Sequence, residues 1–270
     1  MALDKESLEK LLRPRQKKLV GMVDTPFPQA INIQDYVFRK SRAICYNVKR
    51  NYGSSREWYG LLVSERADPS TVTEVYLEEN SSNESAYTSM LGHSIAAAAE
   101  RAGKEDRVVV GWIHSHGALS VFFSGTDRRN MEVVLNSVSA NTRKQVAYEE
   151  VLFDKTSIMV NGETVNNNGG VLIDIDSPQL IMPTAARILQ PLYLGWSYNI
   201  VVNDAGHHHQ EISFLEEKVL TKEEKTWNLD AKLNLIHTDR TLDLDGLAKE
   251  VNEKIGGKRP RRFEGFKALE

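Results

Sequence analysis

The stretch GWIHSHGALSVFFSGTD, residues 111–127, decides the local fold. Together with the preceding RVVV, its first part predicts a buried strand that ends at two histidines. Its last part, followed by RRNMEVVLNSV, predicts a helix that begins near Gly125, because S-x-x-D at Ser124 and Asp127 is typical of a capping box. We therefore expect a strand, a seven-residue connection and a capped helix.

His114 and His116 are expected on the same side of this strand, since alternate strand residues share a face. Each feature has an ordinary explanation: one histidine packs in the core while the other is exposed, and Ser124 with Asp127 only caps a helix. The combination favours a metal site, because the connection can return Asp127 to the end of the strand. Two imidazoles and one carboxylate leave the fourth position of a zinc ion for water, as in hydrolytic sites.

The segments before the histidine strand predict an α/β domain in which helices cover a sheet. The pattern is amphipathic over 35–50, strand-like over 57–63 and 71–79, and helical over 84–104. We expect Gly103 to end the last of these helices with a left-handed cap.

The segments after the capped helix predict mainly strands. Turn-separated β signals between about 140 and 192 predict an inserted β-rich segment, and 196–214 predicts a hairpin of the main sheet. The chain is thus expected to hold an N-terminal extension (1–27), a main domain (28–220) and a C-terminal helical segment with a basic tail (221–270). Leu247, Val251 and Ile255 should share one face of the C-terminal helix.

Composition excludes several classes of protein. The 270 residues are 41% hydrophobic, and 34 basic and 37 acidic side chains are interspersed, so nothing points to nucleic acid or to a membrane surface. Cys45 is the only cysteine, which excludes an internal disulfide framework and a multi-cysteine zinc site. No apolar run reaches the roughly 18 residues of a membrane helix, and the charged N-terminus does not resemble a signal peptide. We expect a cytoplasmic protein.

H-S-H-x(7)-S-x-x-D in this chain resembles the metal motif of the JAMM, or MPN+, zinc metalloproteases, in their prokaryotic form. These enzymes remove ubiquitin or ubiquitin-like modifiers, and they place an upstream glutamate in E-x-x-G-x-L, which Glu57 to Leu62 matches. The resemblance covers about 28–139 and resumes at 196–214. It implies a cytidine-deaminase-like three-layer α/β/α sandwich with a mixed sheet. Two departures are Gly117, where the family often has proline, and the segment 140–192.

The resemblance also implies a role for each site residue. His114, His116 and Asp127 would bind Zn²⁺, which activates a water molecule. Glu57 would act as general acid and base, and Ser124 would stabilise the oxyanion. The substrate would be a ubiquitin-like protein or its conjugate, alone or in a larger assembly, cleaved at an amide or isopeptide bond after its C-terminus.

Two other functions fit the same motif. A non-catalytic scaffold of this fold is one, although such modules usually lack the ligands. A DNA-repair-associated metal hydrolase is the other, although no basic groove is evident. His207 and His209 would share a face of their strand and raise the question of a second metal site, but solvent exposure is the expected state of these histidines.

Overall fold

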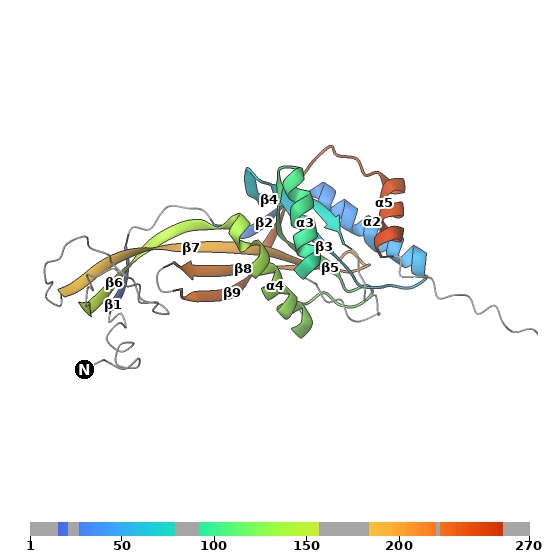
Figure 1. Ribbon diagram of the computed structural model, residues 1–270. Coiled ribbons are helices and arrows are strands. Elements are labelled where there is room, and N and C mark those ends of the chain that lie inside the picture. The colour runs from blue at the N-terminus through green and yellow to red at the C-terminus, as the bar shows by residue number, and fades with distance from the viewer. Residues whose placement is uncertain (1–15, 21–26, 79–91, 157–183, 220–221, 256–270) are drawn as a thin grey trace, which may run out of the picture. The chain divides into compact units, whose positions relative to one another are not determined.

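The computed structural model describes residues 16–20, 27–78, 92–156, 184–219 and 222–255 (Figure 1). The chain divides into two compact units, each of which is discontinuous in sequence. The larger unit comprises Phe27–Thr142, Gly195–Phe214 and Trp227–Glu270. The smaller unit comprises Met1–Pro26, Arg143–Leu194 and Leu215–Thr226. Each unit is described below by itself.

The larger unit is built on a mixed sheet. Its strands, in spatial order, are residues 195–202 of β7 (Thr184–Val202), β5 (Arg107–Ser115), β3 (Trp58–Glu65), β4 (Asp68–Leu77), β2 (Ala30–Gln34) and β10 (Lys232–Ile236). β3 is antiparallel to both β4 and β5, whereas β5 runs parallel to β7. β8 (His208–Lys218) pairs with β7, as expected of the predicted hairpin. The chain therefore has the predicted α/β character, with a mixed sheet.

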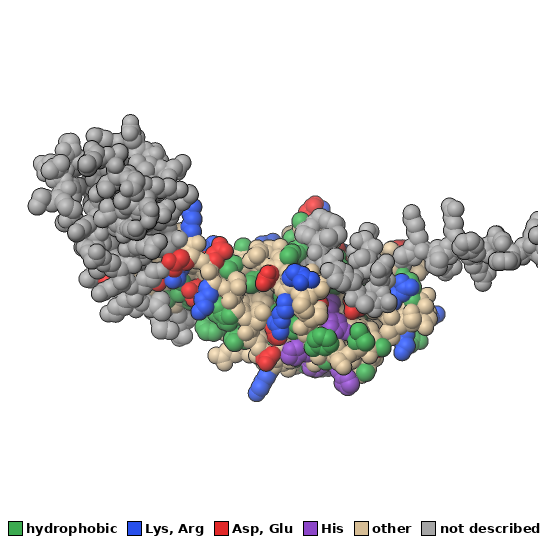
Figure 2. Space-filling view, turned by 90° about the horizontal axis from the view of Figure 1, so that it is seen from below, with side chains coloured by type: hydrophobic (Ala, Val, Ile, Leu, Met, Phe, Trp, Pro, Cys, Tyr) green, Lys and Arg blue, Asp and Glu red, His purple; other side chains and the backbone are tan. Residues whose placement is uncertain are grey.

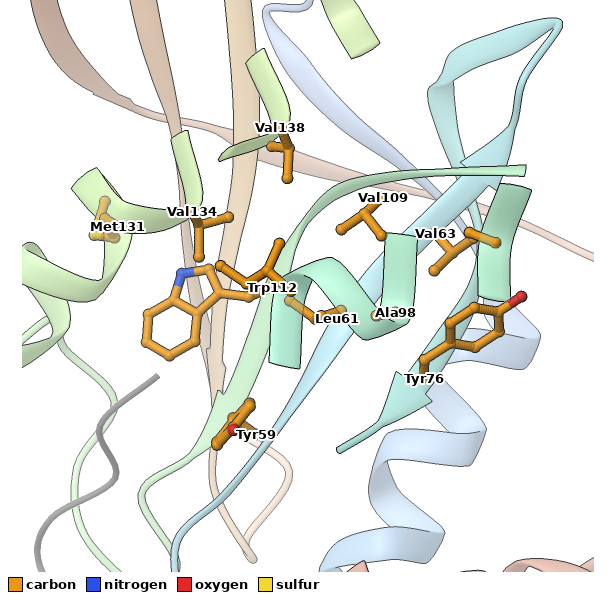
Figure 3. Close-up of a cluster of buried hydrophobic side chains, with 12 residues drawn as sticks. Tyr59, Leu61, Val63, Tyr76, Ala98, Val109, Trp112, Met131, Val134 and Val138 are labelled. Carbon is orange, nitrogen blue, oxygen red and sulfur yellow. The ribbon is translucent and has the colours of Figure 1, made fainter. Parts of the chain in front are cut away.

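Helices α3 (Gly92–Lys104) and α4 (Gly125–Thr142) cover one face of this sheet. Their apolar side chains form a buried cluster with β3, β4 and β5 (Figure 3), whose members include Ala98, Val134, Val138, Leu61, Tyr76 and Trp112. Helix α2 (Asp35–Tyr52) lies against the opposite face, where Cys45 contacts Ser115 of β5. Alternate residues of β5 thus face different helices, which separates Ser115 from the two histidines beside it.

Helix α5 (Leu244–Lys254) confirms the amphipathic pattern at the C-terminal end of the described chain. Leu247, Val251 and Ile255 are all buried, and α5 packs against α2. The Asp243 side chain accepts a hydrogen bond from the Gly246 N–H and so caps the helix. None of the helices in the described part of the chain is long and apolar enough to cross a membrane.

The smaller unit has an antiparallel arrangement in its described residues. β1 (Gln16–Val20) pairs with β6 (Lys144–Thr156), and β6 pairs with residues 184–194 of β7. Inside this unit, the buried Glu149 carboxylate accepts hydrogen bonds from Gln190 and Lys218. Part of the β-rich segment expected between about 140 and 192, residues 157–183, lies outside the described residues.

Two details differ from the sequence-based expectations. Gly103 lies within α3, and the left-handed residue after the helix is Asp106, with φ 55°. The Asp106 carbonyl accepts the Arg66 N–H, which fixes this turn against the β3–β4 hairpin. In addition, β9 (Glu224–Asp230) and β10 lie where the sequence predicts only a helical segment, and β10 is paired in parallel with the distant β2.

Candidate metal centre

The end of β5 brings the two predicted histidines together. His114 and His116 project from the same side of the strand, and their Nε2 atoms are 3.1 Å apart. Both side chains are buried, with 2% and 7% of their surface exposed. Ser115 points to the other side, where its hydroxyl contacts Cys45. The period-two alternation of the strand therefore produces the pair.

The first turn of α4 brings Asp127 to the same point. Its Oδ1 is 3.2 Å from His114 Nε2, and its Oδ2 is 3.3 Å from His116 Nε2. The predicted capping box is present: the Ser124 N–H donates to the Asp127 carboxylate at 2.6 Å, and the Asp127 N–H donates to Ser124 Oγ at 3.2 Å. The Ser124 hydroxyl accepts this bond through a lone pair, and a hydrogen bond of the same side chain with the Asp127 carboxylate helps to lower the pKa of Asp127.

The orientation of His116 leaves its Nε2 free to face His114 and Asp127. These three residues are called the ligand cluster below. Its Nδ1 lies 3.0 Å from the carbonyl oxygen of Ser120, an acceptor that requires a proton on Nδ1. In a neutral ring, Nε2 then carries the lone pair and points at His114 and Asp127. A backbone carbonyl on the second nitrogen is the usual outer contact of a metal-binding histidine.

The two histidines have opposite pKa shifts. Burial lowers the pKa of His114 despite the neighbouring Asp127 carboxylate. Burial also acts to lower the pKa of His116, but hydrogen bonds with Asp127 and the Ser120 carbonyl raise it overall, with a smaller effect from the charge of Glu57. Burial acts to raise the pKa of Asp127, and hydrogen bonds with His114 and His116 lower it well below its usual range. The carboxylate is therefore ionised at neutral pH.

The donor set fits a divalent cation. In a tetrahedral zinc site with bonds of about 2.0–2.1 Å, the ligand atoms are roughly 3.3 Å apart. The two Nε2 atoms are 3.1 Å apart, close to this value, and each lies within 3.3 Å of a different oxygen of the Asp127 carboxylate. A carboxylate and two imidazole nitrogens that face one another need a proton or a cation between them. Zn²⁺ suits a set of two nitrogens and one oxygen.

Glu57 lies just before β3, beside the cluster but outside it. Trp58 pairs with Ser115 and Tyr59 pairs with His114, so Glu57 lies at the end of the sheet where His116 emerges. Its side chain is half-buried, and its charge acts on His116. Among the described residues, the group that could hold an ion at this point contains only His114, His116 and Asp127.

Gly117 shapes the connection that follows the histidines. Its φ of 58° is left-handed, a conformation that proline cannot adopt. A Cβ atom there would lie 3.1 Å from the Ser55 Cβ. The Gly117 N–H donates to Ser115 Oγ, and its carbonyl accepts the Asp204 N–H. Glycine therefore lets the connection turn tightly and be held on two sides.

Apolar side chains lie exposed near this site. Leu119 and Phe122 belong to the connection between β5 and α4, and are 56% and 53% exposed. The Phe122 ring contacts the His116 ring edge-to-face at 5.4 Å. Figure 2 shows hydrophobic and histidine side chains side by side on this face of the molecule. The surface near the two histidines therefore carries apolar side chains that are accessible to solvent.

A second group of possible ligands is better explained as an ion-pair network. His209 Nε2 is 3.6 Å from Glu211 and 3.7 Å from Asp230. However, both oxygens of the Glu211 carboxylate already accept from the Arg128 guanidinium. Asp230 is highly exposed, so water competes for it. His207 is exposed, as expected, whereas His209 is only partly exposed and takes part in this network.

The sequence reading did not assign site roles to Trp112, Asn199 or Arg128. The Trp112 ring stacks on the His114 ring at 4.3 Å with an interplanar angle of 10°. Strand alternation could have revealed Trp112, which is two positions before His114. Asn199 and the Glu211 partner of Arg128 lie on other strands, and no local pattern indicates their contacts.

One comparison with known proteins covers the residues of this site. Residues 42–152 match the family model described as prokaryotic homologs of the JAB domain. This match is consistent with the JAMM/MPN family in its prokaryotic form. No curated protein matches the chain significantly. Among solved structures, it is similar to the solution structure of protein DSY2949 from Desulfitobacterium hafniense, at 14% identity and a TM-score of 0.33, over 76% of this chain and 94% of that one.

Proposed function

We propose that this protein is a zinc-dependent peptidase or isopeptidase that cleaves after the C-terminus of a ubiquitin-like modifier. The observation that carries the proposal is the convergence of His114, His116 and Asp127 at distances that suit one zinc ion, with Glu57 beside them. The match of residues 42–152 to the family model of prokaryotic JAB-domain homologs supports it. The proposal includes the family's cytidine-deaminase-like sandwich as the full description of the fold.

His114, His116 and Asp127 would hold the ion. When bound, zinc supplies a Lewis acid and lowers the pKa of water to roughly 7. Glu57 would take up the proton of the attacking water at its carboxylate and deliver it to the departing amine, a double task for which it must lie within hydrogen-bond reach of both. Its position at the end of β3, half-buried and outside the ligand cluster, supports this assignment.

Ser124 would donate its hydroxyl hydrogen to the oxygen of the attacked carbonyl as negative charge develops there. The capping bond from the Asp127 N–H fixes the position of Ser124 Oγ without using its O–H. The substrate would present an extended C-terminal tail, because such a tail can lie beside a sheet and its apolar residues can contact exposed Leu119 and Phe122.

The test uses two substrates: a ubiquitin-like protein fused through its C-terminal glycine to a reporter protein, and the same modifier joined to a lysine side chain. We expect the wild-type protein, loaded with zinc, to cleave at least one of them. Glu57→Gln should keep the zinc and the fold but lose cleavage. Glu65→Gln, at the opposite end of β3 from Glu57, is the matched control and should cleave normally.

Two results would contradict the proposal. Cleavage by Glu57→Gln at the wild-type rate would remove Glu57 from the mechanism. A folded wild-type protein that binds no zinc at micromolar concentrations would favour the scaffold function instead.

A further inference from the structure

Trp112 holds the ring of His114 from one side. The indole is fully buried and lies parallel to the imidazole, with ring centroids 4.3 Å apart. A stacked ring of this size restricts rotation of the histidine side chain and excludes water from that face. The direction of His114 Nε2 toward Asp127 therefore depends on where the indole lies.

Asn199 of β7 fixes the indole in turn. Trp112 and Asn199 are directly paired across β5 and β7, and the indole N–H donates to Asn199 Oδ1 at 2.9 Å. Asn199 Nδ2 donates to Ser213 Oγ of β8 at 2.9 Å. Asn199 is fully buried, so both ends of its amide must be satisfied, and this sets a single orientation. The chain of contacts runs from β8 through β7 to a ligand on β5.

Glu211 of β8 provides a second connection, to the ligand on α4. Its buried carboxylate pairs with both terminal nitrogens of Arg128, one of them at 2.7 Å. Arg128 directly follows Asp127 in the first turn of α4. A two-bond guanidinium–carboxylate pair is geometrically specific, so it fixes this turn relative to β8.

We propose that the β7–β8 hairpin is the positioning frame of the metal centre, with Asn199 and Glu211 as its positioning residues. Asn199 fixes the orientation of the His114 ring through Trp112. Glu211 fixes the position of Asp127 through Arg128. These two ligands come from different elements, β5 and α4, and the hairpin contacts a neighbour of each ligand. This inference rests on the metal centre of the proposed function and does not require cleavage.

The test measures zinc affinity by competition with a chromophoric chelator in Asn199→Leu and Glu211→Gln. Each variant should bind zinc about 10-fold to 100-fold more weakly, the usual effect of losing an outer contact of a metal ligand. The visible spectrum of the cobalt-substituted protein should also change in band position and intensity, since it reports ligand geometry.

The matched control is Asn47→Leu, which removes a buried amide from α2 whose bond is to the Ala43 carbonyl. It should lower stability without altering zinc affinity or the cobalt spectrum. Should Asn199→Leu fail to fold, Trp112→Phe removes the indole N–H in a smaller change and is expected to weaken zinc binding in the same direction.

The inference would be overturned if zinc affinity were unchanged in Glu211→Gln and also in a folded Asn199→Leu or Trp112→Phe. It would equally be overturned if Asn47→Leu lost as much zinc affinity as these variants. The two proposals fail separately. A wild-type protein that binds zinc but cleaves no modifier disproves the proposed function, and leaves the affinity comparison to decide the role of the hairpin.

Discussion

Ser124 and Asp127 bond to each other in both directions across the first turn of α4. The Ser124 N–H donates to the Asp127 carboxylate, and the Asp127 N–H donates to Ser124 Oγ. The same carboxylate lies within 3.3 Å of both histidine Nε2 atoms. Helix capping and the metal centre therefore share one pair of residues. The Asp127 carboxylate takes part in the cap and also lies beside the two histidines at the end of β5.

Changes at Ser124 should separate capping from catalysis. Ser124→Ala removes the cap and the hydroxyl, so we expect a loss of about 1 kcal/mol in the free energy of unfolding and a roughly 10²-fold fall in cleavage rate. Ser124→Gly costs only a few tenths of a kcal/mol as a cap, yet should lose the same activity. Urea unfolding and cleavage kinetics measure the two effects. Equal activity of Ser124→Gly and the wild type would leave Ser124 with a capping role alone.

Removal of one imidazole should abolish metal binding. His116→Ala leaves two ligands, so we expect the zinc content to fall from about one ion per chain to near zero after dialysis, as measured by elemental analysis. His208→Ala changes an exposed histidine and should retain the wild-type content. Zinc that is lost from His208→Ala but kept by His116→Ala would place the ion elsewhere.

Gly117 should not tolerate a side chain. Gly117→Ala forces a non-glycine residue to φ 58° and places its Cβ 3.1 Å from Ser55, so we expect a loss of about 1–2 kcal/mol in unfolding free energy. Gly125→Ala is the matched control, since its added Cβ meets no atom within 4 Å. Thermal and urea unfolding measure the stability of both variants. Similar stability of Gly117→Ala and Gly125→Ala would mean that the connection adopts another backbone conformation.

Glu74 should make the stability of the larger unit depend on pH. Burial acts to raise its pKa, but the charge of Lys40 and a hydrogen bond from Arg240 lower it below the ordinary value of 4.5. A lowered pKa means that the stabilisation is complete above pH 4.5 and is lost as the pH falls through the pKa of the folded state. We expect Glu74→Gln to cost roughly 2–4 kcal/mol at pH 7.

Unfolding of the wild type and Glu74→Gln by urea between pH 7 and pH 3 tests this dependence. The difference in the free energy of unfolding between the two proteins should shrink as the pH falls, because protonation of Glu74 neutralises the charge that Glu74→Gln lacks at every pH. Glu100→Gln, in an exposed pair with Lys104, is the control and should change stability little at any pH. A constant difference across the range would contradict the assigned role of Glu74.

The ligand set could be predicted because its information is local. His114, His116, Ser124 and Asp127 lie within one short stretch, where strand alternation and the capping box fix their directions. The amphipathic patterns of α2 and α5 were equally readable, since burial on one helix face leaves a periodic trace in the sequence. The catalytic and metal-binding roles of the four site residues stay predictions until the experiments above are done.

The contacts that complete the site were decided by tertiary structure alone. Glu57 reaches the histidines through the antiparallel register of β3 and β5, and Asn199 and Glu211 reach the ligands from a hairpin more than 80 residues further along the chain. β10 likewise joins the sheet beside β2 across 202 residues. Pairing between distant strands depends on which surfaces remain to be buried after local structure has formed, and that is a property of the whole chain rather than of any short segment.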